Sequence, residues 1–236
     1  MDSPEFVFST VHPTTHEPRA RYCIFRSLWA ELPDNSRNPA TRNERLYESD
    51  LLCFTTDKRM SKVGELCGVE GLVNGSGGGG ICEAVFWIKG DVMVQWRIKG
   101  KAYVIGQDID SEGGNVVKKE LMKRMRVVGD ESKQEGWSWG RELTGHFGNM
   151  SPGMRASFAN PPPGQLVNEP YDDKHLKLGG QVEDLDDAVA RANFRVVVIK
   201  PTVVESVDLK DPESARRHVY RFDDSTGVWS HEERWP

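Results

Sequence analysis

The chain has 236 residues, with 31 Lys and Arg side chains against 36 Asp and Glu, which gives a formal net charge of −5 and a pI near 5.7. This charge balance argues against a dedicated nucleic-acid-binding protein, because such proteins carry a basic domain. Hydrophobic residues make up 37% of the sequence, and seven Trp, nine Phe and five Tyr supply core material, which excludes a wholly disordered chain.

No stretch of the sequence is long and apolar enough to cross a membrane. The longest apolar run has about five residues, whereas a spanning helix needs about twenty. The amino terminus lacks the basic and apolar regions of a secretory signal, so we expect a cytoplasmic protein. The four cysteines form no C-x-x-C pair and the six histidines have no ligand spacing, so we expect free thiols and no metal site.

Short β-strand patterns separated by Gly and Pro dominate the chain. Their β-branched and aromatic residues predict strands over residues 21–26, 51–55, 82–89, 92–105, 194–200, 203–209, 217–222 and 227–235. Gly90-Asp91 lies between two of these strands and is typical of a hairpin turn. The predicted fold is therefore mainly β, an antiparallel meander with a few short helices.

Three segments have helical character. Helices are predicted over residues 59–67, 116–128 and 183–193; in the second, apolar residues recur at helical spacing. Residues 129–180 show little periodicity and predict a loop-rich insertion. Because strand patterns resume after it, we interpret residues 1–236 as one domain.

Two short motifs match known patterns without the context that those patterns require. Residues 75–80 satisfy G-x-G-x-x-G, but a strand follows where a dinucleotide site needs a helix, so we expect a flexible surface loop. Residues 136–140 satisfy G-x-S-x-G around Ser138, but no buried strand precedes them. A serine hydrolase that uses Ser138 is kept as an alternative.

Cations and hydroxyls gather at two strand ends. Arg21 and Arg26 bracket the first predicted strand, and residues 55–62 lead from the second into a short helix. Threonine hydroxyls with Arg and Lys side chains could bind a phosphate through charge-assisted hydrogen bonds. The pattern predicts a phosphate pocket, and a plain charged turn is the alternative interpretation.

An ordered series of segments extends over most of the chain. These are RYCIFR (21–26), FTTDKRMSK (54–62), VFWIKGDVMVQWRIKGKA (85–102), FANPPPG (158–164), RRHVYRF (216–222) and GVWSHEERWP (227–236). The series resembles the pyridoxamine 5′-phosphate oxidase-like FMN-binding split β-barrel proteins. The resemblance implies FMN as the cofactor, an antiparallel split barrel with short flanking helices, and a homodimer with FMN at the subunit interface.

The resemblance also implies which residues contact the flavin. Matched position by position to the family's motifs, the FMN contacts are Arg21, Ile24, Arg26, Thr55, Thr56, Arg59, Ser61, Lys62, Gln95 and Arg217. No catalytic residue is implied, because the flavin itself carries the electrons.

The chain departs from the oxidase at several of the family's positions. Met60 stands where much of the family has Ser, and Ser61 where the oxidase has Arg. Val207 occupies the place of a Trp that packs on the flavin, and residues 213–215 replace the substrate-binding R-x-H. The branch usually opens with an A-P-W-R helix, and this chain begins after it.

Because of these departures, we do not expect the chain to be a true pyridoxamine 5′-phosphate oxidase. The sequence instead predicts an FMN-dependent oxidoreductase that acts on an unidentified small molecule. The alternative is a flavin-binding or carrier module without turnover of its own.

Overall fold

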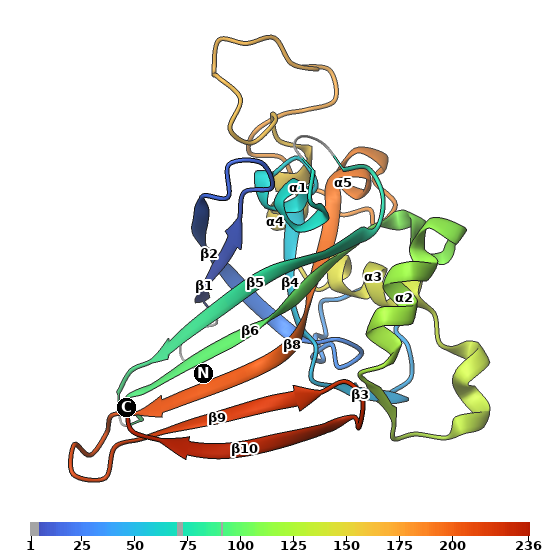
Figure 1. Ribbon diagram of the computed structural model, residues 1–236. Coiled ribbons are helices and arrows are strands. Elements are labelled where there is room, and N and C mark those ends of the chain that lie inside the picture. Colours follow the sequence, from blue (N-terminus) through green and yellow to red (C-terminus); the bar gives the residue numbers. More distant parts are fainter. Residues whose placement is uncertain (1–4, 70–72, 91) are drawn as a thin grey trace.

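The computed structural model describes residues 5–69, 73–90 and 92–236, and an eight-stranded antiparallel sheet forms their centre (Figure 1). The strand order is β10-β9-β8-β4-β2-β1-β5-β6, and β8 also pairs with β6. That second pairing closes six strands into a barrel and leaves β9 and β10 as an extension. The strands are β1 (Glu5–Val11), β2 (Pro18–Leu28), β4 (Leu52–Asp57), β5 (Gly77–Ile88), β6 (Val94–Ile105), β8 (Phe194–Asp208), β9 (Arg216–Asp223) and β10 (Val228–Arg234).

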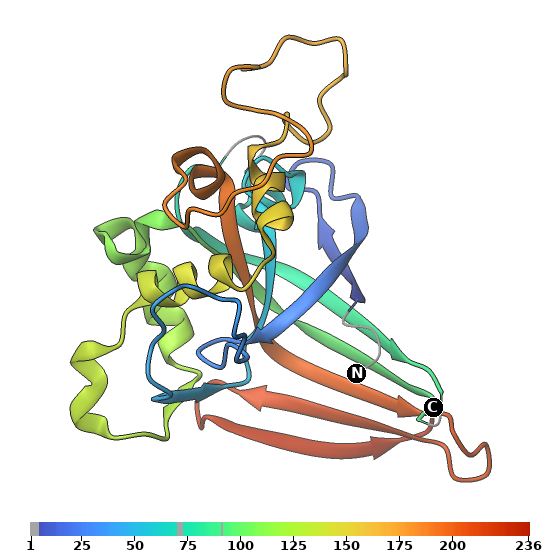
Figure 2. The ribbon, with the colours of Figure 1, turned by 180° about the vertical axis from the view of Figure 1, so that it is seen from behind.

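Short helices flank the barrel (Figure 2). They are α1 (Ser61–Cys67), α2 (Asn115–Met122), α3 (Trp139–Gly148), α4 (Pro152–Ala156) and α5 (Ala188–Asn193), and of these α3, α4 and α5 belong to the segment between β7 and β8. Single 3-10 turns lie at 107–110, 112–114, 131–136 and 157–159, and β3 (Tyr47–Ser49) pairs with β7 (Met125–Val127). Among the described residues, no helix has the length and apolar character of a membrane span.

The buried apolar residues form two clusters. Inside the barrel, Phe6 stacks on Phe86 with ring centroids 4.8 Å apart, and Phe8 lies 4.8 Å from Phe54. The second cluster lies between the barrel and the flanking helices, and its largest member is the fully buried Trp29. Offset aromatic pairs of this kind stabilise a core beyond their buried area.

A buried histidine stacks in this second cluster. The His146 ring of α3 lies 5.6 Å from the Trp29 ring and nearly parallel to it. Complete burial, together with the smaller effect of the positive charges of Arg26 and Arg42, lowers the pKa of His146 from 6.5 to about 3. The ring is therefore neutral at physiological pH.

The predicted strands are confirmed, with adjusted ends. Residues 194–200 and 203–209 form one continuous strand, β8, with a bulge at Thr202, next to Pro201, where the register with β6 shifts by one residue. β1 was not predicted, although its FVFST pattern alternates between buried and half-buried positions. The pairing of β5 with β6 is confirmed, while Asp91 of the predicted turn lies outside the described residues.

Each predicted helix is shorter than expected. The prediction for 116–128 is wrong beyond Met122, because the Arg124 side chain turns inward to Asp50 and the Pro201 carbonyl, and residues 125–127 become β7. The segments at 59–67 and 183–193 are helical only over Ser61–Cys67 and Ala188–Asn193. At the latter, the Asp187 carboxylate accepts the Ala190 N–H and caps the first turn.

The glycine-rich run is a strand and not the expected flexible loop. Residues 77–80 begin β5 and pair with β6 through a bulge. A Cβ on Gly80 would lie 2.7 Å from the Leu66 carbonyl oxygen, so glycine lets helix α1 approach this strand closely. The glycines therefore help to fix the position of α1.

The insertion at 129–180 contains helices that its weak periodicity did not predict. Ser138 is the N-cap of α3, and its Oγ accepts the Arg141 N–H at 3.1 Å. A 3-10 turn precedes it where a nucleophile elbow requires a strand. The structure therefore argues against Ser138 as a nucleophile and assigns it a capping role.

Candidate cofactor site

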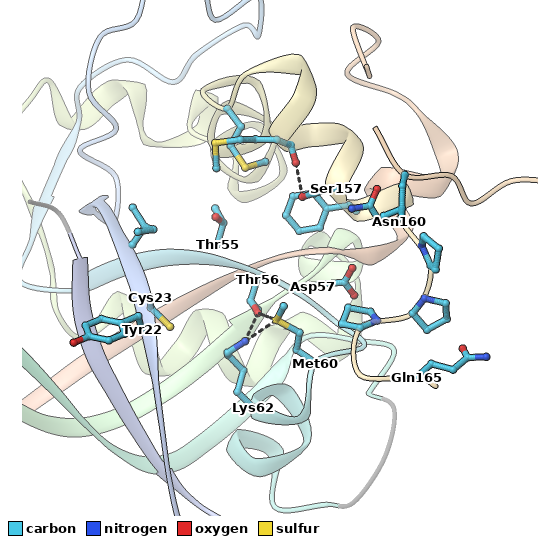
Figure 3. Close-up of a pocket in the computed structure, with 18 of the residues that line it drawn as sticks. Tyr22, Cys23, Thr55, Thr56, Asp57, Met60, Lys62, Ser157, Asn160 and Gln165 are labelled. Carbon is cyan, nitrogen blue, oxygen red and sulfur yellow. Dashed lines mark hydrogen bonds between the residues drawn. The ribbon is translucent and has the colours of Figure 1, made fainter. Parts of the chain in front are cut away.

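A buried lysine lies where β4 passes into α1. Lys62 is only 7% exposed, and its Nζ donates to Thr56 Oγ1 at 3.2 Å and contacts Met60 Sδ at 2.8 Å (Figure 3). Within the part of the chain that the structure describes, no carboxylate oxygen lies within 4.0 Å of this ammonium. Burial lowers the pKa of Lys62, because desolvation disfavours the charged form. An unpaired buried cation of this kind is suited to an anionic ligand.

The lysine faces a cavity of about 650 Å³, which is within the usual size of a small-ligand site. Ile24, Arg26, Thr55, Thr56 and Lys62 line its barrel side, so the structure brings together five of the predicted contacts. The opposite side comes from residues 150–178 of the insertion.

A second cavity, of about 660 Å³, adjoins the first at Met60 and Lys62. Three further predicted contacts, Arg21, Arg59 and Ser61, line it. Eight of the ten predicted residues therefore border one continuous region around Lys62.

The Arg59 side chain holds the two sides of the site together. Its guanidinium forms a bidentate pair with Asp57, at 2.9 Å and 2.6 Å. It also donates to the carbonyl oxygens of Asn160, at 3.0 Å, and Phe158, at 3.3 Å. Because these bonds use four of the five N–H groups of the guanidinium, Arg59 anchors the insertion to the end of β4.

The predicted arginines of β2 differ in their pairing. Arg21 Nη2 lies 2.7 Å from the carboxylate of the buried Glu65, and Nη1 donates to Thr10 Oγ1 at 2.5 Å. Arg26 has no ion pair within the described residues, and its Nε is buried without a hydrogen-bond partner. Burial lowers the pKa of Arg26 for the reason given for Lys62. Arg26 and Lys62 are thus two unneutralised cations beside one cavity.

Gln95 and Arg217 lie apart from the other eight residues. Both are in register with Val207 of β8, Gln95 on β6 and Arg217 on β9. Arg217 Nη1 donates to Glu205 at 3.0 Å, and neither residue lines the two cavities. The starts of β6 and β9 lie at the corner of the sheet far from α1 (Figure 1). One chain alone does not bring all ten residues together.

The sequence reasoning missed the apolar side of the cavity. Met150, Met154, Phe158, Tyr171 and Leu178 all face it from the insertion. The only available signal was the FANPPPG segment, which belongs to the series on which the resemblance rests but had no assigned role. Among the described residues, no group of three or more His, Cys, Asp or Glu side chains is placed to hold a metal ion.

Comparison with known families identifies the barrel part of the chain. Residues 1–106, from before β1 to the end of β6, match the family described as the FMN-binding domain of pyridoxamine 5′-phosphate oxidase. This segment is similar to that FMN-binding family, and the match covers less than half of the 236-residue chain. The matched segment contains Lys62, Thr55 and Thr56, so the buried cation and its hydroxyl neighbours lie within the matched residues.

Solved structures share the fold over nearly the whole chain. A pyridoxamine 5′-phosphate oxidase-related, FMN-binding protein from Nostoc punctiforme PCC 73102 is 18% identical, with a TM-score of 0.62 over 99% of this chain and 88% of that one. PhzG from Burkholderia lata 383, solved in complex with tetrahydrophenazine-1-carboxylic acid, is 14% identical, with a TM-score of 0.52 over 100% of this chain and 84% of that one. A search of curated proteins finds no match. The resemblance to a split barrel is confirmed.

Proposed function

We propose that the protein is an FMN-dependent oxidoreductase whose FMN phosphate binds at Lys62. The observation that carries the proposal is the buried, unneutralised ammonium beside Thr56, within the domain that matches an FMN-binding family. When bound, the flavin supplies the hydride or electron transfer. The protein supplies binding, orientation and a site partly shielded from water.

Four of the predicted contacts then have a physical role in this proposal. Lys62 and Thr56 offer a charge-assisted donor and a hydroxyl to the phosphate, and Arg26, which lines the same cavity, offers a second positive charge. Arg59 acts through Asp57 and the insertion, as a positioning residue that keeps the far side of the cavity in place. These residues fit FMN because a dianion would neutralise charges that the chain itself leaves unpaired.

The separation of Gln95 and Arg217 from Lys62 supports a homodimer with FMN between the subunits. In this proposal, one subunit contributes the Lys62 side of the site and its partner contributes Gln95 and Arg217. An apolar groove of about 190 Å³ on the barrel supports the same assembly, because Phe25, Trp96 and four other apolar residues line it without a charged group. A second copy of the chain would cover this groove.

The substrate is not expected to be pyridoxamine 5′-phosphate. The exposed Glu213 and the half-buried Ala215 stand just before β9, where the oxidase has an Arg and a His that bind the substrate. Arg216 does not replace them, because its Nη1 donates to the Ala215 carbonyl at 2.8 Å and its guanidinium lies 4.9 Å from the Trp235 ring. Desolvating a substrate phosphate without fixed cations costs several kcal/mol.

The second candidate is a flavin carrier without turnover. No histidine of the described residues lines either cavity, so a general acid or base of that type is missing. Reduction of the FMN-loaded protein by NADH or NADPH, followed by oxygen uptake, separates the two candidates. Repeated turnover supports the oxidoreductase, and a flavin that stays oxidised with both donors supports the carrier.

A further inference from the structure

The two sides of the main cavity have opposite chemical character (Figure 3). The barrel side carries Arg26, Asp57 and Lys62. The insertion side, from residues 150–178, is mainly apolar, and its polar side chains are uncharged among the described residues that line the cavity. Its main members are Met150, Met154, Phe158, Leu166, Tyr171 and Leu178, and we call it the insertion wall.

Two of the polar groups on the insertion wall are already used by the chain itself. Ser157 Oγ donates to the Met154 carbonyl at 2.6 Å, and Gln165 Nε2 donates to the Pro170 carbonyl at 2.8 Å. The Asn160 amide and the Tyr171 hydroxyl also line the cavity, so this side offers two neutral polar groups, and no opposite charge, to an ionised group. Transfer of an ionised group into such surroundings is strongly unfavourable.

On the barrel side, no positively charged side chain among the described residues remains free to bind a second anion. Asp57 is neutralised by its bidentate pair with Arg59. Arg26 and Lys62 are the remaining cations of this cavity, and the proposed function assigns both to FMN. A reactant bound beside the flavin therefore meets an uncharged surface.

The shape of the insertion wall favours a flat molecule. Pro161, Pro162 and Pro163 form a stiff segment, because each ring fixes its own backbone torsion. Met150 and Met154 line the same cavity, and flexible, polarisable thioethers pack well against aromatic rings. Leu166 and Leu178, which also line the cavity, are mostly exposed, which gives the cavity an apolar entrance.

We propose that the molecule that reacts with the flavin is a neutral, flat aromatic compound without a phosphate or carboxylate group, bound against the insertion wall. The inference rests on the proposed function, because that function places a flavin beside this wall. It extends the proposed function by naming a substrate class.

A matched pair of probes tests the inference on the FMN-saturated protein. 1-Naphthol and 1-naphthyl phosphate share the same ring system and differ by one phosphate. Equilibrium dialysis should give a Kd for 1-naphthol at least about tenfold below that for the phosphate ester, a difference of about 1.4 kcal/mol. Equal affinity, or tighter binding of the ester, overturns the inference.

A matched pair of variants locates the bound probe. Met154 is 41% exposed and lines the cavity, whereas Met122 of α2 is 40% exposed and does not. Met154→Glu should weaken 1-naphthol binding at least about tenfold, and Met122→Glu should change it less than about twofold. Met154→Leu, which keeps the apolar volume, should retain binding. Equal effects of the two Glu variants would place the probe elsewhere and overturn the inference.

The experiment separates failure of this inference from failure of the proposed function. FMN uptake is measured first, by absorbance of the desalted protein, and dialysis of the probes does not use the flavin signal. A protein that takes up no FMN contradicts the proposed function. A protein that takes up FMN and prefers the phosphate ester contradicts only the substrate class.

Discussion

Replacing Lys62 with Met should weaken FMN binding and leave riboflavin binding nearly unchanged. The substitution removes the charge and keeps the length of a side chain that is only 7% exposed. FMN and riboflavin differ by the phosphate alone, so a group that binds the phosphate discriminates between them.

The magnitude follows from the donors of Lys62. Its ammonium has three N–H groups; Thr56 Oγ1 at 3.2 Å and Met60 Sδ at 2.8 Å take two, which leaves one for a phosphate oxygen. A hydrogen bond to a charged group contributes about 1.5–3 kcal/mol. Lys62→Met should therefore raise the Kd for FMN about 10- to 150-fold.

Fluorescence titration of both flavins provides the assay, with Lys58→Met as the matched control. Lys58 lies four residues away, donates to Asn74 Oδ1 at 3.3 Å and lines neither cavity. The control should leave the FMN affinity within about twofold, because exposed polar contacts contribute little.

Two results would refute this reasoning. If Lys62→Met weakened FMN and riboflavin equally, the lysine would support the cavity and not the phosphate. If it weakened neither, the flavin would bind elsewhere.

Four further predictions concern stability, assembly and substrate choice. The pKa of His146 is about 3 in the folded state against 6.5 in the unfolded state, so the stability that its neutral ring contributes is complete above pH 6.5 and falls by about 1.4 kcal/mol per pH unit as the pH drops toward 3. In urea unfolding, the free energy of unfolding of His146→Gln should therefore fall less steeply with decreasing pH. The exposed His175→Gln should leave this pH dependence unchanged. Gly80→Ala should cost about 1–3 kcal/mol of unfolding free energy in the same assay, since its Cβ would meet the backbone of α1, whereas Gly136→Ala, with open space around it, should stay within about 0.5 kcal/mol. Sedimentation should give about twice the 26.6 kDa chain mass, and a flavin-bound monomer would contradict the dimer. An oxygen-coupled assay of the FMN-loaded protein with pyridoxamine 5′-phosphate should show turnover far below about 10 per second, and a rate near that value would show that the exposed Glu213 segment does not prevent substrate binding.

The strands could be predicted because their patterns are local. The β-branched and aromatic runs of β4, β5, β6 and β8 appear directly in the sequence, and the structure has strands at those places. β1 has the same alternation, but we considered its residues only as a candidate signal sequence. In the insertion, α3 was missed because its buried face packs on Trp29 and other distant residues, and such tertiary contacts leave little periodic signal.

The site could be predicted only in part. Thr55, Thr56 and Lys62 are adjacent in sequence, so their convergence follows from one strand end and one helix start. The insertion wall comes from residues about 100 positions later, and Arg59 holds it in place through backbone carbonyls that no motif encodes. Whether Gln95 joins the same site depends on a second chain, and a dimer with FMN between its subunits stays a prediction.

The absorption spectrum of the purified, desalted protein, recorded before and after incubation with excess FMN, tests the central claim most directly. Retention of the two visible bands of an oxidised flavin after desalting is the result that we predict, because the phosphate would bind at a buried cation. Their loss in the Lys62→Met variant, with retention in Lys58→Met, would place the flavin at the β4–α1 junction. A protein that shows no flavin bands under either condition would contradict the proposal that this chain works as an FMN-binding enzyme.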